Sequence, residues 1–152
     1  MTPVTLRPAT SADSEFCFQL HKAAMGGYIT AIWGWDEQRQ WGAHTRKFNP
    51  GRWQIITIGG TDIGMIDVEY QPVEIYLSRI EIHPDYQGRG IGTRLISALL
   101  DEARRRGQDL VLDVLIVNHR VRALYQRLGM TEVARDGGGN IRITMRSARP
   151  RQ

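Results

Sequence analysis

The stretch that decides the fold runs from Arg79 to Leu95 and reads RIEIHPDYQGRGIGTRL, with three alternating glycines between a predicted strand and a predicted helix. Glycine lets the backbone adopt a positive φ and approach a ligand closely. The amides at a helix N-terminus lack intrahelical partners and carry partial positive charge. The sequence therefore predicts a phosphate-binding turn here, to which Arg89 and Arg94 add charge.

The spacing of the glycines separates this turn from other phosphate-binding loops. A dinucleotide-binding loop reads G-x-G-x-x-G and lies in the first strand–helix–strand unit, whereas this one reads G-x-G-x-G and lies mid-chain. The lysine and hydroxyl residue that end a Walker loop are absent. A kinase loop lies between two strands rather than before a helix. A tight turn that merely begins a helix is the remaining structural interpretation.

Working outward from the turn, hydrophobic periodicity and turn residues predict helices and strands on both sides. Before it we expect a strand at Val4–Leu6, a helix from Ser11 or Asp13 to about Ala24 that ends at Gly26-Gly27, an aromatic loop Tyr28–Trp35, a helix Asp36–Phe48, and strands Trp53–Ile58, Ile63–Tyr70 and Glu74–His83. After it we expect a helix Ile91–Ala103, a strand Leu110–Val117, a helix Val121–Leu128 ended by Gly129, and strands Thr131–Arg135 and Ile141–Met145 around a hairpin turn at 136–140.

This order predicts an α/β (α+β) fold in one domain over residues 1–152, with a frayed tail at 147–152. Two hairpins and one strand–helix–strand crossover indicate a mixed, mostly antiparallel sheet of about seven strands with helices on both faces. The crossover should be right-handed and should join two parallel strands at the centre of the sheet.

Composition excludes several classes of protein. The chain has 41% hydrophobic and 24% charged residues, which is ordinary globular usage, and no apolar run long enough to span a membrane. Met1–Ser11 lacks the layout of a signal peptide. Cys17 is the only cysteine, so we expect a buried thiol, no metal site and a reducing, cytoplasmic location.

The net charge of +4 comes from 18 arginines and two lysines against 16 acidic residues. Because the arginines are dispersed and balanced by acids, the pattern argues against nucleic acid as a partner and suits a small polyanionic ligand. The nearest basic cluster, Arg104 to Arg106, is typical of the charged end of a helix.

Two motifs in order carry a family resemblance. The first is Gln87-x-x-Gly90-x-Gly92, after a strand and Pro84; the second is Asn118 followed by Ala123-Leu124-Tyr125-Gln126-Arg127-Leu128-Gly129-Met130. Together they resemble the acyl-CoA signature and the Asn…A-x-x-x-Y-x-x-x-G-F stretch of the GNAT superfamily of N-acyltransferases. Met130 replaces the usual Phe, and Tyr125 follows Ala123 by two residues. The element order agrees with that family over about residues 4–146.

The resemblance implies that acetyl-CoA lies where two parallel strands, Ile75–His83 and Leu110–Val117, splay apart. Backbone groups of Ile80, Glu81 and Ile82 would pair with the pantetheine arm. The pyrophosphate would be held by the turn amides, those of Gln87, Gly88, Arg89, Gly90, Ile91, Gly92 and Thr93. Asn118 would hydrogen-bond the pantetheine, although a turn or helix cap is the alternative role for this side chain.

The resemblance also implies that Tyr125 binds near the thioester and protonates the leaving thiolate, because a phenol and a thiol have similar pKa values. The alternative for Tyr125 is a core aromatic. The usual base position, nine residues before Gln87, is Ser78, so the chain departs from the family there. Glu74 shares that strand face and could act through water. Asp67 and Glu69, on the neighbouring strand, are alternatives, and each carboxylate could equally be solvated or ion-paired.

The acceptor is expected beside the first two helices, where Tyr28, Trp33, Trp35 and Asp36 could bind a cationic or aromatic amine. A hydrophobic lid, a contact between two copies of the chain in a homodimer, and an Asp36 helix cap are the competing interpretations.

The leading hypothesis is an N-acetyltransferase that moves an acetyl group from acetyl-CoA to the primary amine of a small molecule or peptide, by direct attack in a ternary complex. A non-catalytic acyl-CoA sensor or interaction domain on the same fold is the alternative, supported by the missing base at Ser78. An RNA-associated protein, including a transferase acting on aminoacyl-tRNA, ranks lower.

Overall fold

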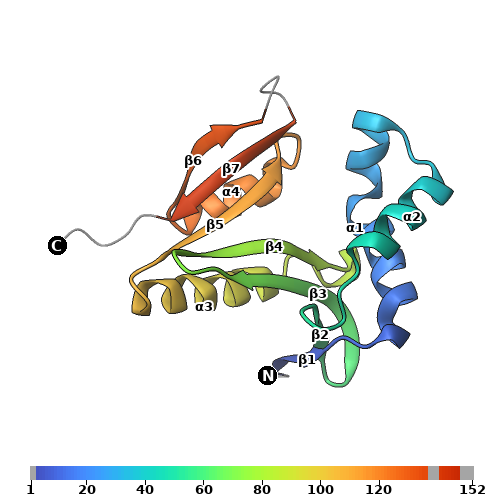
Figure 1. The fold of residues 1–152 in the computed structure, drawn as a ribbon, viewed down its shortest axis with the longest axis horizontal. Helices are drawn as coiled ribbons and strands as arrows, with labels where there is room; N and C mark the ends of the chain where they lie inside the picture. Colours follow the sequence, from blue (N-terminus) through green and yellow to red (C-terminus); the bar gives the residue numbers. More distant parts are fainter. Residues whose placement is uncertain (1–2, 137–140, 148–152) are drawn as a thin grey trace. The chain divides into compact units, whose positions relative to one another are not determined.

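The structure is a computed structural model that describes residues 3–136 and 141–147. Its seven strands hydrogen-bond in the order β1-β2-β3-β4-β5-β7-β6 (Figure 1). The predicted parallel pair is confirmed: β4 (Glu74–Ile82) lies parallel to β5 (Asp109–Leu115), from the pair Glu74/Asp109 to the pair Leu77/Leu112. The chain divides into two compact units, Met1–Asp67 with Arg79–Ile91, and Val68–Ser78 with Gly92–Gln152.

The first unit contains three antiparallel strands, two long helices and the end of β4. Its elements are β1 (Val4–Pro8), η1 (Ser11–Asp13), α1 (Ser14–Trp33), α2 (Glu37–Lys47), β2 (Gln54–Ile58), most of β3 (Thr61–Tyr70) and η2 (Pro84–Tyr86). Cys17 and Leu20 of α1 pack against Ile55 of β2 and Met65 of β3. Burial confirms the expectation for Cys17, whose side chain is 1% exposed.

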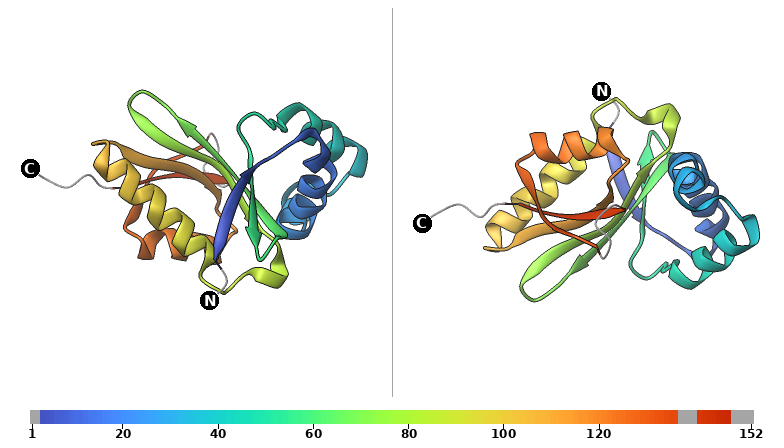
Figure 2. Two further views of the ribbon diagram at one scale, coloured as in Figure 1. Left: turned by 90° about the horizontal axis from the view of Figure 1, so that it is seen from below. Right: turned by 90° about the horizontal axis from the view of Figure 1, so that it is seen from above.

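The second unit contains the predicted crossover and the C-terminal hairpin. Its elements are the end of β3, the start of β4, α3 (Ile91–Arg105), β5, α4 (His119–Arg127), β6 (Met130–Arg135) and β7 (Arg142–Ser147). Figure 2 shows α3 and α4 next to each other on one face of β5 and β7. Gly129, with a φ of 92°, ends the helical stretch as predicted. Residues 137–140 of the predicted hairpin turn and residues 148–152 of the predicted tail lie outside the described residues.

The prediction that Gly26-Gly27 ends the first helix is wrong. Helix α1 continues for 20 residues to Trp33 and ends at Gly34, which has a φ of 79° and donates its N–H to the carbonyl of Thr30 at 3.0 Å. A glycine costs a helix about 1 kcal/mol but does not break its hydrogen bonds. The Trp35 ring folds back along α1, since a Cβ built on Gly26 would lie 3.9 Å from it. The expected aromatic loop is therefore largely helical.

Gly27→Ala should stabilise the protein by about 1 kcal/mol, because a Cβ there meets nothing within 4 Å and alanine is the better helix former. In a chain of this size that corresponds to a rise of roughly 2–4 °C in Tm. Gly64→Ala is the contrast: its Cβ would meet the backbone oxygen of Glu81 at 2.5 Å, so Tm should fall. A Gly27→Ala protein that melts below the wild type would contradict the continuous helix.

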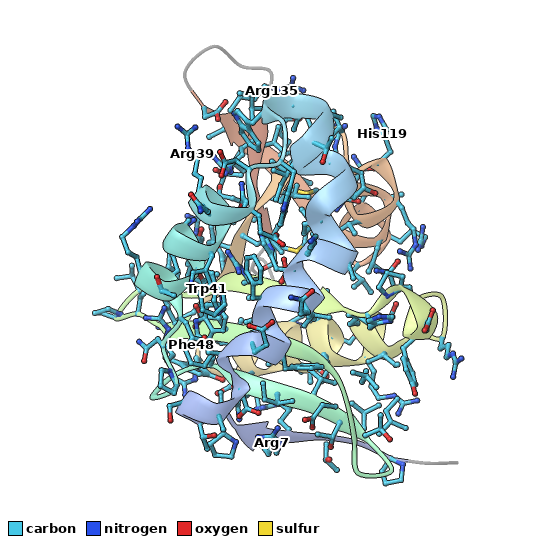
Figure 3. The ribbon with its side chains drawn as sticks, turned by 90° about the vertical axis from the view of Figure 1, so that its right-hand side faces the viewer. Arg7, Arg39, Trp41, Phe48, His119 and Arg135 are labelled. Carbon is cyan, nitrogen blue, oxygen red and sulfur yellow. The ribbon has the colours of Figure 1, made fainter. Side chains whose placement is uncertain are left out.

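Arg7 joins three segments at the edge of the first unit (Figure 3). Its guanidinium donates to both carboxylate oxygens of Asp13, at 2.9 and 2.8 Å, and to Asp62 at 2.9 Å. The hydrogen bond from Arg7 lowers the pKa of Asp13 to about 2. Because the unfolded chain binds this proton near pH 4, the stabilisation is complete above that pH and is lost as the pH falls toward 2.

Asp13→Asn should lower the free energy of unfolding at pH 7 by on the order of 1 kcal/mol, the value for a partly solvated ion pair. Urea unfolding at steps from pH 5 to pH 2.5 should then show a smaller acid-induced loss in the variant than in the wild type. Equal acid sensitivity of the two proteins would mean that Asp13 does not carry the effect.

Candidate functional site

The predicted phosphate-binding turn joins β4 to α3. His83 caps the short helix η2 by accepting the N–H of Asp85 on Nδ1 at 3.1 Å. Gly88 and Gly90 follow with φ angles of 76° and 80°, and α3 begins at Ile91. These two positions therefore need glycine for conformational reasons, whereas Gly92 already belongs to the helix.

Side chains of the turn tie it to its own backbone. The amide of Gln87 donates to the carbonyl of Ile82 at 2.9 Å, and the guanidinium of Arg89 donates to the carbonyl of Asp85 at 3.1 Å. The same guanidinium lies 4.9 Å from the centre of the Tyr86 ring. These contacts fix the turn before any ligand binds, and they hold a positive charge beside it.

The turn fits a phosphate group by the space next to its backbone. A Cβ built on Gly88 or Gly90 meets nothing within 4 Å, so a ligand oxygen can approach the amides there. The first amides of α3 have no intrahelical partner and point their partial positive charge the same way. The residues present are therefore suited to the pyrophosphate of an acyl-CoA.

Strand β4 enters this turn through Ile80, Glu81 and Ile82, the residues expected to pair with pantetheine. On one edge β4 is held by β3: His83 donates its N–H to the carbonyl of Ile63 at 2.8 Å. The glycine at position 64 permits a close approach of the two backbones, since any Cβ there would meet the Glu81 carbonyl. The end of β4 is thus fixed tightly in the first unit.

The structure adds a histidine that sequence reasoning missed. The Nδ1 atom of His21, on α1, lies 2.6 Å from Oε2 of Glu81, whose side chain is only 5% exposed. The second oxygen of Glu81 is buried and has no hydrogen-bond partner among the residues that the structure describes. The one sequence signal was weak: His21 follows Cys17 by four residues and so lies on the buried side of the predicted helix.

The aromatic residues proposed to contact the acceptor belong to α1 and the segment that follows it. Tyr28 and Trp33 lie in the last turns of α1, where Trp33 is 51% exposed. Trp35 donates its ring N–H to Glu37 at 2.9 Å, and Lys22 donates to the same carboxylate at 2.9 Å. The Trp35 ring and Glu37 therefore already bind a cation of the chain itself.

Asp36 caps helix α2, as one of the competing interpretations expected. Its carboxylate accepts the N–H of Arg39 at 3.0 Å. On the same helix, Trp41 is 38% exposed and packs against Phe18 with the two rings nearly perpendicular and their centres 5.0 Å apart. Figure 3 shows Trp41 and Phe48 close together beside α1.

In the second unit, Asn118 and Tyr125 are both buried. Asn118 is the N-cap of α4, and its side-chain oxygen accepts the N–H of Val121 at 3.4 Å, which leaves this long hydrogen bond easy to exchange. Tyr125 is 5% exposed, and burial raises its pKa above the ordinary value. The phenol of Tyr125 is therefore protonated at neutral pH and can act as a donor.

A second polar cluster involves Tyr76, which lies eleven residues before Gln87. Its hydroxyl donates to Oδ2 of Asp113 at 2.7 Å, and Thr144 donates to Oδ1 of Asp113 at 2.5 Å. Burial and the neighbouring Asp113 raise the pKa of Tyr76. Asp113 was missed, although it is the only charged residue in the apolar stretch Leu110–Val117.

Two of the carboxylates considered as bases, Glu74 and Asp67, are held in ion pairs, and Glu69 lies half-buried near the end of β3. Glu74 lies 3.0 Å from Arg146, which also contacts Asp109 at 3.1 Å. Glu74 begins β4, six residues before Ile80 and roughly 20 Å away along the strand. Nε and Nη2 of Arg52 donate to the two carboxylate oxygens of Asp67. These placements argue for structural roles.

The part of the chain that the structure describes holds neither a metal-binding group of side chains nor a membrane-spanning helix. There, no group of three or more His, Cys, Asp or Glu side chains could hold a metal ion. None of the helices in this part is long and apolar enough to cross a membrane.

Comparisons with known proteins agree with this geometry. The sequence model of the Acetyltransferase (GNAT) family matches residues 15–130. The N-alpha-acetyltransferase RimI of Mycobacterium tuberculosis is 32% identical over 137 residues, which cover 86% of this chain and 80% of that protein. The [ribosomal protein bS18]-alanine N-acetyltransferase of Escherichia coli is 42% identical over 60 residues, 39% of this chain and 40% of that protein.

Solved structures share the fold. The PaiA N-acetyltransferase of Thermoplasma acidophilum, crystallised in complex with coenzyme A, superposes with a TM-score of 0.74 at 16% identity, covering 95% of this chain and 98% of that one. At this identity the match concerns the fold alone. It agrees with the strand order and with the parallel pair described above.

Proposed function

The chain belongs to the acetyltransferase (GNAT) family, and from this premise we propose that it transfers an acetyl group from acetyl-CoA to a primary amine by direct attack in a ternary complex. The observation that carries the proposal is the turn after β4, with two positive-φ glycines, open space beside them and a helix start. A bound acetyl-CoA would supply an activated acyl group, as a thioester, to this site.

The turn and β4 hold the donor in this proposal. The amides from Gln87 to Thr93, namely those of Gln87, Gly88, Arg89, Gly90, Ile91, Gly92 and Thr93, bind the pyrophosphate. Arg89 adds charge from a side chain that is already fixed. The backbone of Ile80, Glu81 and Ile82 pairs with the pantetheine, and Asn118 exchanges its long cap hydrogen bond for one to the same arm.

Tyr125 is the proposed proton donor to the departing thiolate. The phenol is protonated at neutral pH when the thiolate forms beside it, although burial raises its pKa and so makes it a weaker acid than an exposed tyrosine. Tyr28, Trp33, Trp35 and Asp36 shape the acceptor side. We favour amines at peptide N-termini, because their pKa near 8 leaves more neutral amine at pH 7 than that of a lysine. The names of two relatives, an N-alpha-acetyltransferase and a ribosomal protein bS18-alanine N-acetyltransferase, support this choice.

Acetyl-CoA should stabilise the folded protein, because a ligand that binds only the native state adds to its stability. At a hundred times Kd the gain is about 2.7 kcal/mol, or roughly 5–10 °C in Tm for a chain of this length. Gly90→Asp should abolish the shift, since it blocks the turn and adds a repelling charge. Gly107→Asp is the matched control, since Gly107 also has a positive φ, of 66°, and open space beside it but lies outside the turn. Equal shifts in both variants would refute the phosphate-binding turn.

Tyr125→Phe should lower kcat and kcat/KM together, by about 10² or more, and leave the acetyl-CoA-induced Tm shift intact. Loss of a contact made only in the transition state has this signature. The ring is kept, so the protein should fold. Thiol release with short peptides and small amines measures the effect. An unchanged kcat where chemistry limits the rate would make Tyr125 a core aromatic, and binding without turnover of any amine would favour the acyl-CoA sensor.

A further inference from the structure

Four buried carboxylates in the described residues can be compared, and one differs from the others. Asp13, Asp67 and Asp109 each face an arginine, whose guanidinium stays charged at any physiological pH. Glu81 instead faces His21, at 2.6 Å. An arginine could join α1 to β4 and satisfy both oxygens of Glu81. With His21 as the partner, Oε1 is buried and has no hydrogen-bond partner in the described part of the chain.

The contact sets the protonation of the imidazole. An ionised carboxylate only accepts hydrogen bonds, so Nδ1 of His21 must carry the hydrogen, and in the neutral ring Nε2 then keeps its lone pair. Nε2 makes no hydrogen bond within the described part of the chain, and the His21 side chain is 16% exposed. The ring lies beside Trp35, with centres 6.4 Å apart. A base positioned by a third group has this arrangement.

The other titratable groups around the His21–Glu81 pair either have partners of their own or stay neutral. On β4, Arg79 stacks on Trp53, with its guanidinium carbon 5.3 Å from the ring centre. On α2, burial lowers the pKa of His44, which keeps that ring neutral. On α1, burial raises the pKa of Cys17 to about 12, so the thiol is also neutral. Lys22 and Glu37 neutralise each other.

We infer that His21, oriented by Glu81, is the general base that deprotonates the acceptor amine, a role that rests on the proposed function and that Ser78 cannot fill. Nε2 takes one proton from the ammonium. The neutral nitrogen then forms a bond to the acetyl carbon as the carbon–sulfur bond breaks. Tyr125 gives its proton to the thiolate, the second nitrogen proton then passes to the Tyr125 phenolate and restores the phenol, and His21 releases its proton to water. Glu81 lies on β4, among the three residues proposed to align pantetheine, and His21 faces it from α1.

The kinetic test uses thiol release with a panel of probe amines: tripeptides with N-terminal alanine, serine or glycine, the free amino acids and spermidine. With the fastest probe, His21→Gln should lower kcat/KM about 100-fold at pH 7. It should also remove the limb of the kcat/KM–pH profile that a titrating base produces. The deficit should shrink as the pH passes the pKa of the amine, because a neutral amine needs no base. Glu81→Gln should give a smaller loss, of about tenfold.

His119→Gln is the matched control, an exposed histidine on α4 whose loss should leave the profile unchanged. All variants should keep the acetyl-CoA-induced Tm shift. The proposal would be overturned if folded His21→Gln kept kcat/KM within about twofold of the wild type. It would also be overturned if the variant kept the wild-type pH limb and only its Tm fell. Either result would leave the pair a structural contact.

A second readout does not depend on activity. In protein labelled with ¹⁵N-histidine, the nitrogen shifts of neutral His21 should show hydrogen on Nδ1 and a bare Nε2, and Glu81→Gln should change this preference. Hydrogen on Nε2 in the wild type would overturn the proposal. If acetyl-CoA binds but the wild type turns over none of the probes, the proposed function fails and the base role fails with it. Normal turnover that is insensitive to His21 rejects the base alone.

Discussion

The approach of two backbones at Gly64 is the constraint on which the first unit depends. Only a residue without a side chain allows the Glu81 carbonyl to come so close that a Cβ would lie 2.5 Å from it. With β4 held there, the Glu81 side chain contacts His21 of α1, and the last residues of the strand lead directly into the turn. One glycine therefore couples the position of the buried acid to that of the proposed phosphate-binding backbone.

The arginine-rich composition acquires a structural explanation from the ion pairs. Arg7, Arg52 and Arg146 each bind a buried aspartate. Arg7 and Arg146 also bind second carboxylates, Asp62 and Glu74, which lie 55 and 72 residues away in the sequence. A planar guanidinium can satisfy both carboxylate oxygens, which an ammonium cannot do with the same geometry. These three arginines thus hold strands and turns together, which agrees with a positive charge that is dispersed along the chain.

Features set by the local backbone could be predicted from the sequence, and features set by distant partners could not. The turn, α3, the buried strand β5 and Gly129 follow from glycine conformation and hydrophobic period. The predicted length of α1 was wrong because the packing of the Trp35 ring over Gly26, and not helix propensity, decides where this helix ends. His21 and Glu81 are 60 residues apart and Tyr76 and Asp113 are 37 apart, so no spacing rule connects them.

The burial of Cys17 has a practical consequence for the chemistry of the whole chain. With the thiol 1% exposed and its pKa raised to about 12, almost no thiolate exists at neutral pH. A thiol reagent added to the native protein will therefore find no target on the polypeptide, since Cys17 is its only cysteine. Labelling of Cys17 would instead mark the moments when α1 lifts from β2 and β3, which gives the protein an intrinsic reporter of local opening.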